Sequence, residues 1–580
     1  MADISIVQTT DRILLISTNK RILPYGIAIN KSDFSYSRYD GTTQKIPSEE
    51  NVISTTNIQG CLIGVAPLLS GRYLIVADKT TVVAQIPGVS STPNNIYRVD
   101  SVQLIPFHAN QQSLITIPLY DEEQSYLEML QWILQVKSFY FSFTTDITHT
   151  RQREITATAP DQRFFWNRNY VTDFQEVAKE WVVPLTMGFV KQSKFNYAGQ
   201  DYRITLMSRR NHQRAGTRYY QRGADQKGNV ANNVETEQIF ESLSQKDTYT
   251  SFVQIRGSVP LLWSQFPNLA YKPRVKFYGS ETVNQSAVRT HFSQLYDLYG
   301  DTTIVNLIDK KSDELKLGEA YEKGIAKLSH VKYIWFDFHA ICKGMRYDKL
   351  SILMDMIKDD IQRDGFFMAK GGSPVQRQKG IVRTNCIDNL DRTNVVQTLV
   401  SKQQLVAQLT ALAIDKKLLD SPQFDSIYKN MWADHADVIS TQYSGTGALK
   451  NDYTRTGKRS TAGLIQDGEN SLKRYYLNNF IDGFRQDAFD LFTGVYKVDA
   501  EQLRQPKHPM QLIWIAFVLL VALFIYTFIL PSSTTILNSL IVFIVFWLVT
   551  LFITAKSMKK YNNLFVDKPF LVKPEETYRF

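Results

Sequence analysis

The chain has 580 residues, enough for several hydrophobic cores, and carries a formal net charge of +10. Its three cysteines are too few for a disulfide scaffold and favour a reducing compartment. The positive charge favours an anionic partner, whether nucleic acid, membrane surface or phosphorylated substrate. No basic segment followed by a long apolar one stands at the start, so we expect no cleaved signal.

Short, β-branched apolar runs separated by turns dominate the first 180 residues. We expect strands at 13–16, 61–65, 73–76, 82–86, 97–107 and 139–143. No long linker rich in glycine, serine or proline follows them. Residues 1–180 are therefore expected to form a β-rich sub-domain closely joined to a catalytic domain at 181–500.

An arginine cluster between Ser208 and Gly223 is interleaved with Tyr219 and Tyr220. Its members are Arg209, Arg210, Arg214, Arg218 and Arg222. The spacing suits a solvated, ion-paired face, and arginines with aromatics also suit contact with nucleic acid. The spacing alone leaves both interpretations open.

A buried strand is expected at 333–339, ending at Asp337 and His339. His339 and Cys342 have the spacing of two metal ligands, but no second pair follows, so we expect no metal site. Both Asp337 and His339 fit hydrogen-bonded structural residues. Asp337 is also a third candidate for an acid in catalysis.

The stretch at 380–394, G-I-V-R-T-N-C-I-D-N-L-D-R-T-N, predicts a strand, a polar loop and the start of a helix. Ile381 and Val382 form the short β-branched run before Cys386. Apolar residues recur at spacings of three and four over 393–414, which predicts a helix there.

This loop suits a cysteine-based phosphatase. A thiol at the start of a helix, six positions before Arg392, is favoured as the thiolate by the helix dipole and the guanidinium. The backbone amides of the loop and the planar fork of Arg392 can hold a phosphate. The loop residues expected beside that phosphate are Ile387, Asn389, Leu390 and Thr393.

The predicted reaction has two displacements. The Cys386 thiolate attacks phosphorus, and water then hydrolyses the phosphocysteine. The leaving alkoxide needs a proton from a nearby carboxylic acid, for which Asp391 is favoured and Asp388 is the runner-up. Cys386 could instead be a buried structural cysteine, but its polar neighbours argue against an apolar environment.

Two further basic segments are candidates for contact with a lipid head group or a bilayer. The first, at 369–380, carries Lys370, Arg377 and Lys379. The second includes Lys450, Arg455, Lys458 and Arg459. An ordinary solvated loop explains the first segment equally well.

Two uncharged apolar stretches, at 512–530 and 536–554, are each long enough for a transmembrane helix. A linker at 501–511 precedes them, and a tail at 555–580 follows. Lysine and arginine flank the pair on both outer sides, so we expect both termini in the cytosol.

The motif R-T-N-C-I-D-N-L-D-R-T-N resembles the signature of the Sac-domain phosphoinositide phosphatases, R-x-N-C-x-D-C-L-D-R-T-N. Further blocks at 214–240, 335–339 and 445–450 are also similar to that family, whose homology would cover about 115–450. The first of these blocks favours packing of the arginine cluster around the catalytic unit, with some of its arginines meeting lipid head groups. With its two apolar stretches, the whole chain is similar to the endoplasmic-reticulum member. Asn389 stands where the family usually has a second loop cysteine, which leaves any disulfide protection of Cys386 in doubt.

The resemblance implies an α/β catalytic domain of the cysteine-phosphatase type that acts on phosphatidylinositol 4-phosphate. It implies the 3-phosphate and the 3,5-bisphosphate as further substrates, no cofactor or metal, no nucleic acid, and a place in the endoplasmic-reticulum membrane with cycling to the Golgi. Two alternatives stay open: an inactive membrane-anchored adaptor that binds phosphoinositides, and a phosphotyrosine phosphatase. Nothing in the sequence identifies a protein partner.

Overall fold

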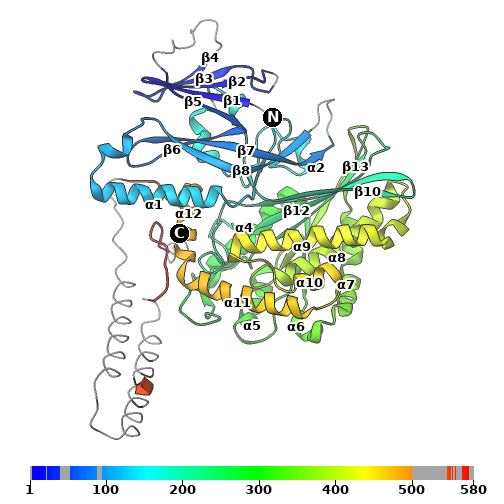
Figure 1. Cartoon of the computed structure of the whole chain (residues 1–580). Coiled ribbons are helices and arrows are strands. Elements are labelled where there is room, and N and C mark those ends of the chain that lie inside the picture. The colour runs from blue at the N-terminus through cyan, green and yellow to red at the C-terminus, as the bar shows by residue number, and fades with distance from the viewer. Residues whose placement is uncertain are drawn as a thin grey trace.

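The computed structural model describes residues 3–499 apart from 21, 40–51, 88–93 and 175, and beyond them 545, 547–549, 552, 556 and 565–573. Its N-terminal part is a largely antiparallel sheet (Figure 1). The strands are β1 (Asp3–Thr9), β2 (Arg12–Ser17), β3 (Gly26–Asn30), β4 (Tyr36–Tyr39), β5 (Val52–Gln59), β6 (Cys61–Pro67), β7 (Arg72–Ile86), β8 (Asn94–Pro106) and β9 (Phe139–Phe141).

The predicted β-rich character of this region is confirmed, with two differences. The strands expected at 73–76 and 82–86 form one strand, β7, because the polar residues between them continue to pair with β8 through shifts of register. A helix that we did not expect, α1 (Ile117–Leu134), packs against α12 (Asp482–Phe492), where the rings of Trp132 and Phe489 lie 6.0 Å apart.

A second, mixed sheet forms the centre of the catalytic part. Its pairing order is β10 (Thr186–Tyr197), β11 (Gln200–Arg210), β12 (Val234–Ser242), β13 (Tyr249–Arg256), β20 (Gly380–Asn385), β16 (Asp301–Asn306) and β17 (Val331–Trp335). The first four strands are antiparallel, and the last four are parallel to one another. Pairing of β9 with β10 joins the two sheets closely.

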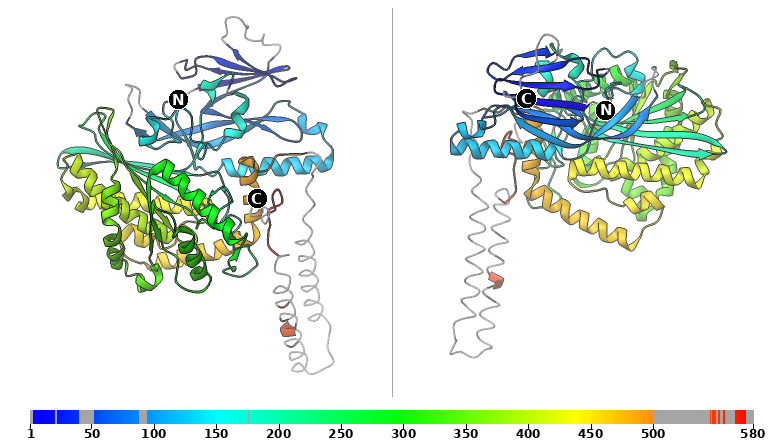
Figure 2. Two further views of the ribbon diagram at one scale, coloured as in Figure 1. Left: turned by 180° about the vertical axis from the view of Figure 1, so that it is seen from behind. Right: turned by 45° about the horizontal axis from the view of Figure 1, so that its top comes forward.

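Helices cover both faces of this sheet (Figures 1 and 2). One face carries α4 (Glu281–Tyr299) and α5 (Ser312–Ile325), and the other carries α7 (Leu350–Asp364), α8 (Asp391–Ala411) and α9 (Pro422–Ser444). Neighbouring residues of β20 point to opposite faces, so Ile381 packs with Phe292 of α4 while Val382 packs with Val396 of α8. The α/β architecture expected for residues 181–500 is confirmed.

Further α-helices and strands belong to the described part. They are α2 (Arg151–Glu154), α3 (Arg168–Val171), β14 (Trp263–Ser264), β15 (Lys276–Phe277), α6 (Phe338–Ile341), β18 (Phe367–Lys370), β19 (Ser373–Gln376), α10 (Asn451–Thr456) and α11 (Thr461–Phe480). The strand expected at 333–339 is β17 and ends earlier, at Trp335, because Asp337 caps α6 by accepting a hydrogen bond from the amide of Ala340.

The apolar stretch at 512–530 and the linker at 501–511 lie outside the described residues, as does most of 536–554. Among the helices that are described, none has both the length and the apolar character needed to cross a bilayer. Part of the predicted tail, 565–573, packs against α12: the amides of Phe570 and Leu571 donate to Asp487, and the amide of Phe484 donates to Asp567.

Candidate active site

The loop between β20 and α8 carries the predicted nucleophile. Cys386 directly follows the last residue of β20, and α8 begins at Asp391, two residues before the predicted start. Asp391 and Arg392 therefore lie in the first turn of the helix, at the positive end of its dipole. Sites in such sheets form beyond the carboxyl ends of parallel strands, which is where this loop lies.

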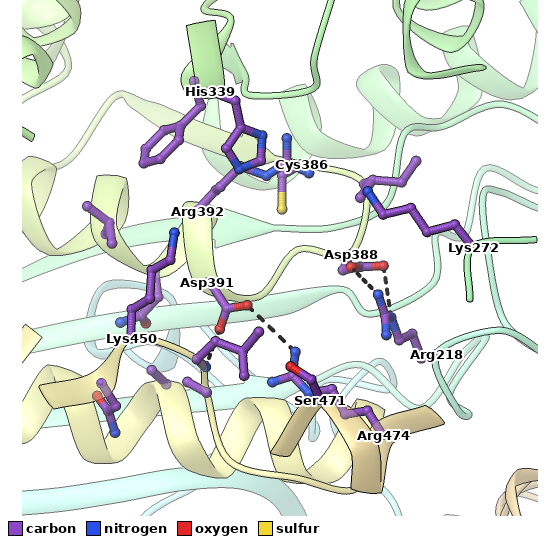
Figure 3. A pocket seen from close by; sticks show the side chains of 18 of the residues that line it. Arg218, Lys272, His339, Cys386, Asp388, Asp391, Arg392, Lys450, Ser471 and Arg474 are labelled. Atoms are coloured by element: carbon purple, nitrogen blue, oxygen red, sulfur yellow. Dashed lines mark hydrogen bonds and ion pairs between the residues drawn. The ribbon is translucent and has the colours of Figure 1, made fainter. Parts of the chain in front are cut away.

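A cavity of about 270 Å³ opens over the loop. Figure 3 shows the sulfur of Cys386 directed into it, with the side chain of Arg392 alongside. Six lysine and arginine side chains and three carboxylates line the cavity: Arg218, Arg222, Lys272, Arg392, Lys450, Arg474, Glu314, Asp388 and Asp391. The excess of positive charge fits a phosphorylated ligand.

Arg392 is held in place from the β16 side of the cavity. Its Nη1 donates to the carbonyl of Leu307 at 2.9 Å and to Asp309 Oδ1 at 3.0 Å, and lies 3.4 Å from Glu314 Oε2. Burial lowers the pKa of Arg392, but Cys386, Glu314 and Asp309 outweigh burial and keep that pKa above its usual range. The guanidinium is thus a fixed cation beside the sulfur.

Two arginines keep the side chain of Asp388 in its ionised form. Arg218 donates to it through Nε at 3.1 Å and Nη2 at 2.7 Å, and Arg222 Nη2 donates at 2.5 Å. Burial raises the pKa of Asp388, but the two guanidinium groups outweigh burial and hold that pKa far below its usual range. Asp388 therefore positions the loop and has no proton to give near neutral pH.

Asp391 has a looser environment at the cavity wall. Its Oδ1 accepts a hydrogen bond from the amide of Leu449 at 2.8 Å, and its Oδ2 lies 3.7 Å from Arg474 Nη1. The side chain is 30% exposed. It lines the cavity opposite Cys386 (Figure 3). Of the two loop aspartates, Asp391 is the one whose carboxyl is not paired with two arginines.

The remaining loop residues shape the backbone around the sulfur. Asn389 is fully buried with φ of 55°, a conformation that asparagine tolerates, and its Oδ1 accepts the amide hydrogen of Cys386 at 3.1 Å. The carbonyl of Ile387 accepts from Arg222 at 2.9 Å. Leu390 packs with Val234, and Thr393 is buried in the first turn of α8.

The structure does not bring the peripheral basic candidates to the cavity. Lys370, Arg377 and Lys379 are exposed around the β18–β19 hairpin, which lies at the amino end of β20, while Cys386 follows its carboxyl end. Arg455 is paired with Asp434 and Asp437.

Arg459 is likewise paired with acids, Asp452 and Asp467, and Lys458 is exposed. Of the basic residues of that second segment, Lys450 alone belongs to the cavity lining in the described part of the chain.

The arginine cluster at 209–222 is not a solvated face, so that interpretation is wrong. Arg209 is buried and paired with Glu235 and Glu237 across neighbouring strands. Arg210 is buried as well, and Arg214 donates to the carbonyl of Arg222. Through Arg218 and Arg222 the cluster serves the catalytic loop.

Other residues of the site were missed by sequence reasoning. Asp309 and Glu314 hold Arg392. His339 was expected as a hydrogen-bonded structural residue, and its Nδ1 does contact Asp309 Oδ1 at 2.8 Å. Lys272 and Arg474 line the cavity from distant segments. Asp309 could have been predicted, because it lies just after β16, a strand that pairs with β20. No sequence pattern around Lys272 or Arg474 indicated that they would reach the site.

Comparisons with known proteins identify the family of the chain. A family model described as the SacI homology domain matches residues 60–343. The "Phosphatidylinositol-3-phosphatase SAC1" of Drosophila melanogaster is 38% identical over 569 residues, covering 93% of each chain.

Two further relatives cover similar lengths. The SAC1-A protein of Danio rerio is 36% identical over 89% of this chain and 90% of its own. The SAC1 protein of Saccharomyces cerevisiae is 34% identical over 91% of this chain and 87% of its own. These relatives favour an enzyme over an inactive adaptor. The chain belongs to the Sac family and is a phosphoinositide phosphatase.

Proposed function

We propose that the protein removes phosphate from monophosphorylated phosphatidylinositols through a phosphocysteine on Cys386. The observation that carries the proposal is the meeting of the Cys386 sulfur and the Arg392 side chain in one cation-lined cavity (Figure 3). The cysteine sulfur can act as the nucleophile at phosphorus, and the surrounding cations can hold the phosphate that it attacks.

In the first step, the Cys386 thiolate attacks phosphorus and the bond from phosphorus to the inositol oxygen breaks. Arg392 stabilises the charge on the equatorial phosphate oxygens, because Asp309 and Glu314 already fix its guanidinium. No metal ion is needed, since the surrounding cations balance the charge of the phosphate.

Asp391 is the proposed general acid. It protonates the departing inositol oxygen, and its carboxylate then takes a proton from the water that attacks phosphocysteine. That second attack breaks the phosphorus–sulfur bond and restores the thiolate. The geometry supports Asp391 over Asp388, because Arg218 and Arg222 keep Asp388 ionised.

The substrate proposal is phosphatidylinositol 4-phosphate as the main substrate, with the 3-phosphate and the 3,5-bisphosphate as others. The family resemblance supports the 4-phosphate, and the names of the fly, fish and yeast relatives support the 3-phosphate.

A phosphate-release assay tests the reaction. Purified full-length protein is offered each phosphoinositide isomer and a phosphotyrosine peptide, with and without chelator. We expect turnover of the lipids, faster than of the peptide, that survives chelator and is lost in Cys386→Ser. Dependence on magnesium, or turnover by Cys386→Ser, would contradict the mechanism.

We also propose that residues 512–530 and 536–554 anchor the protein in the endoplasmic-reticulum membrane with both termini in the cytosol, and that it cycles to the Golgi. Length and lack of charge support the two spans. Alkaline extraction of membranes should leave the protein in the pellet, and protease added to sealed microsomes should remove tags from both ends. Protection of either tag would contradict the topology.

A further inference from the structure

The helix α11 exposes large apolar side chains along one face. Leu464 is 58% exposed, Ile465 71%, Leu472 72% and Tyr476 54%. Positions 464, 468, 472 and 476 follow one another at steps of four, so they form a stripe on the helix surface. Position 468 is a glycine, so the large side chains stand at the two ends of this stripe. A single exposed leucine needs no explanation, but several large apolar side chains exposed on one helix mark an interaction surface.

The same helix forms part of the cavity wall with its inner side. Ser471, Arg474, Tyr475 and Asn478 line the cavity. Arg474 is buried and donates to Thr446 Oγ1 at 2.6 Å, Ser440 Oγ at 2.8 Å and the carbonyl of Gly447 at 2.7 Å. α11 is therefore fixed to the cavity wall, and the exposed apolar side chains stand on the same helix as the lining residues.

A neighbouring loop at 268–277 extends this surface. Tyr475 of α11 donates to the carbonyl of Leu269 at 2.9 Å, which joins the loop to the helix. The loop exposes Tyr271 (68%) and Phe277 (40%). It also exposes three basic residues, Lys272, Arg274 and Lys276.

The basic residues of this loop are available for an anionic partner. Within the described residues, neither Lys272 nor Arg274 forms an ion pair, and Lys272 lines the cavity together with Tyr271. Basic residues interspersed with exposed apolar and aromatic ones are the composition of surfaces that lie in the interface of an anionic bilayer.

We propose that α11 and the 268–277 loop form a membrane-docking surface that presses the cavity mouth onto an anionic bilayer. This inference rests on the proposed lipid substrate: a head group extends only a short way from the bilayer, so the rim of the cavity must reach the bilayer surface. The apolar stripe enters the boundary between head groups and acyl chains, and the basic loop binds the lipid phosphates. Figure 1 shows α11 along the lower edge of the catalytic part.

A spin label at position 468 tests the docking independently of catalysis. Gly468 lies in the stripe, and no atom stands within 4 Å of a Cβ added there. Gly468→Cys is labelled in the full chain carrying Cys386→Ser and reconstituted in vesicles containing phosphatidylserine. The matched control label is at Val375 of β19, which is 55% exposed and lies by the amino end of β20.

We expect the label at 468 to become accessible to lipid-soluble oxygen and protected from a water-soluble nickel complex, while the label at 375 stays in water. Equal exposure of both labels to water would overturn the proposal and would point to a protein partner on the stripe. This result does not depend on whether the chain turns over lipid, so it separates the docking from the proposed reaction.

A rate comparison adds a second test. The variant with Leu464→Glu and Leu472→Glu should keep its rate on a water-soluble, short-chain phosphatidylinositol phosphate. On the long-chain lipid in the same vesicles its rate should fall about tenfold or more. Val375→Glu should keep both rates. An unchanged rate on vesicles, or an equal loss on both substrates, would overturn the docking surface.

Discussion

The β18–β19 hairpin and the wall of the cavity are both rich in lysine and arginine, yet only one of them is beside the nucleophile. The hairpin gathers Lys370, Arg377 and Lys379 from one short stretch at the amino end of β20. The cavity gathers its cations from segments spread between residues 218 and 474. The order of the strands, and not the local density of charge, decides which cations meet the phosphate.

The largest effect is expected when Asp391, the proposed general acid at the cavity wall, is replaced. Asp391→Asn should lower kcat on lipid by about 10²–10⁴-fold, because a positioned acid contributes that much. The loss should shrink with p-nitrophenyl phosphate, whose leaving group needs no proton. Steady-state rates on both substrates provide the measurement. An unchanged kcat on lipid would show that Asp391 is not the general acid.

The next effect concerns stability. Asp388→Asn leaves Arg218 and Arg222 without their carboxylate, which should cost about 3–5 kcal/mol of unfolding free energy. Because the pKa of Asp388 is lowered in the fold, its contribution is fully present above the ordinary aspartate pKa of about 3.9 and is lost as pH falls below it.

Denaturant unfolding in detergent at neutral and acidic pH measures both effects. Between neutral and acidic pH, the unfolding free energy of Asp388→Asn should therefore fall less than that of the parent protein. Asp355→Asn, at a highly exposed side chain of α7, is the control and should change the unfolding free energy by less than about 0.5 kcal/mol. A parent and an Asp388→Asn variant of equal stability would contradict the role of the arginine pair.

A smaller effect is expected at the cavity rim. Lys272→Ala should lower kcat/KM about tenfold, mostly through KM, since a hydrogen bond to a charged group is worth about 1.5–3 kcal/mol. The fall should be smaller at high salt, where the exposed lysine is already screened. A fall in kcat with KM unchanged would place Lys272 in the chemical step instead.

The smallest effect is expected at the hairpin. The triple variant Lys370→Ala, Arg377→Ala and Lys379→Ala should change kcat/KM on soluble lipid by less than about twofold, because the length of β20, ~20 Å, separates these residues from Cys386. A loss as large as that of Lys272→Ala would remove the contrast between the two regions.

The sequence allowed much of this to be predicted, for reasons that the structure makes clear. The strand, loop and helix around Cys386 are contiguous, so the periodicity of the apolar residues was enough to place them. Arg218 and Arg222 were noticed, but not their pairing with Asp388, since that contact joins positions 166 and 170 residues apart. Lys272 and Arg474 lie in segments without a pattern, and only the folded sheet brings them to the cavity.

The contact between the segment 565–573 and α12 has a practical consequence for shortened versions of the protein. Asp487 is buried and accepts hydrogen bonds from the amides of Phe570 and Leu571. A fragment that stops near residue 499 would lose both of these hydrogen bonds, which are worth about 1.5–3 kcal/mol each because the acceptor is charged. Adding residues 565–573 as a separate peptide, or fusing them directly after α12, should restore the unfolding free energy that the truncation removes.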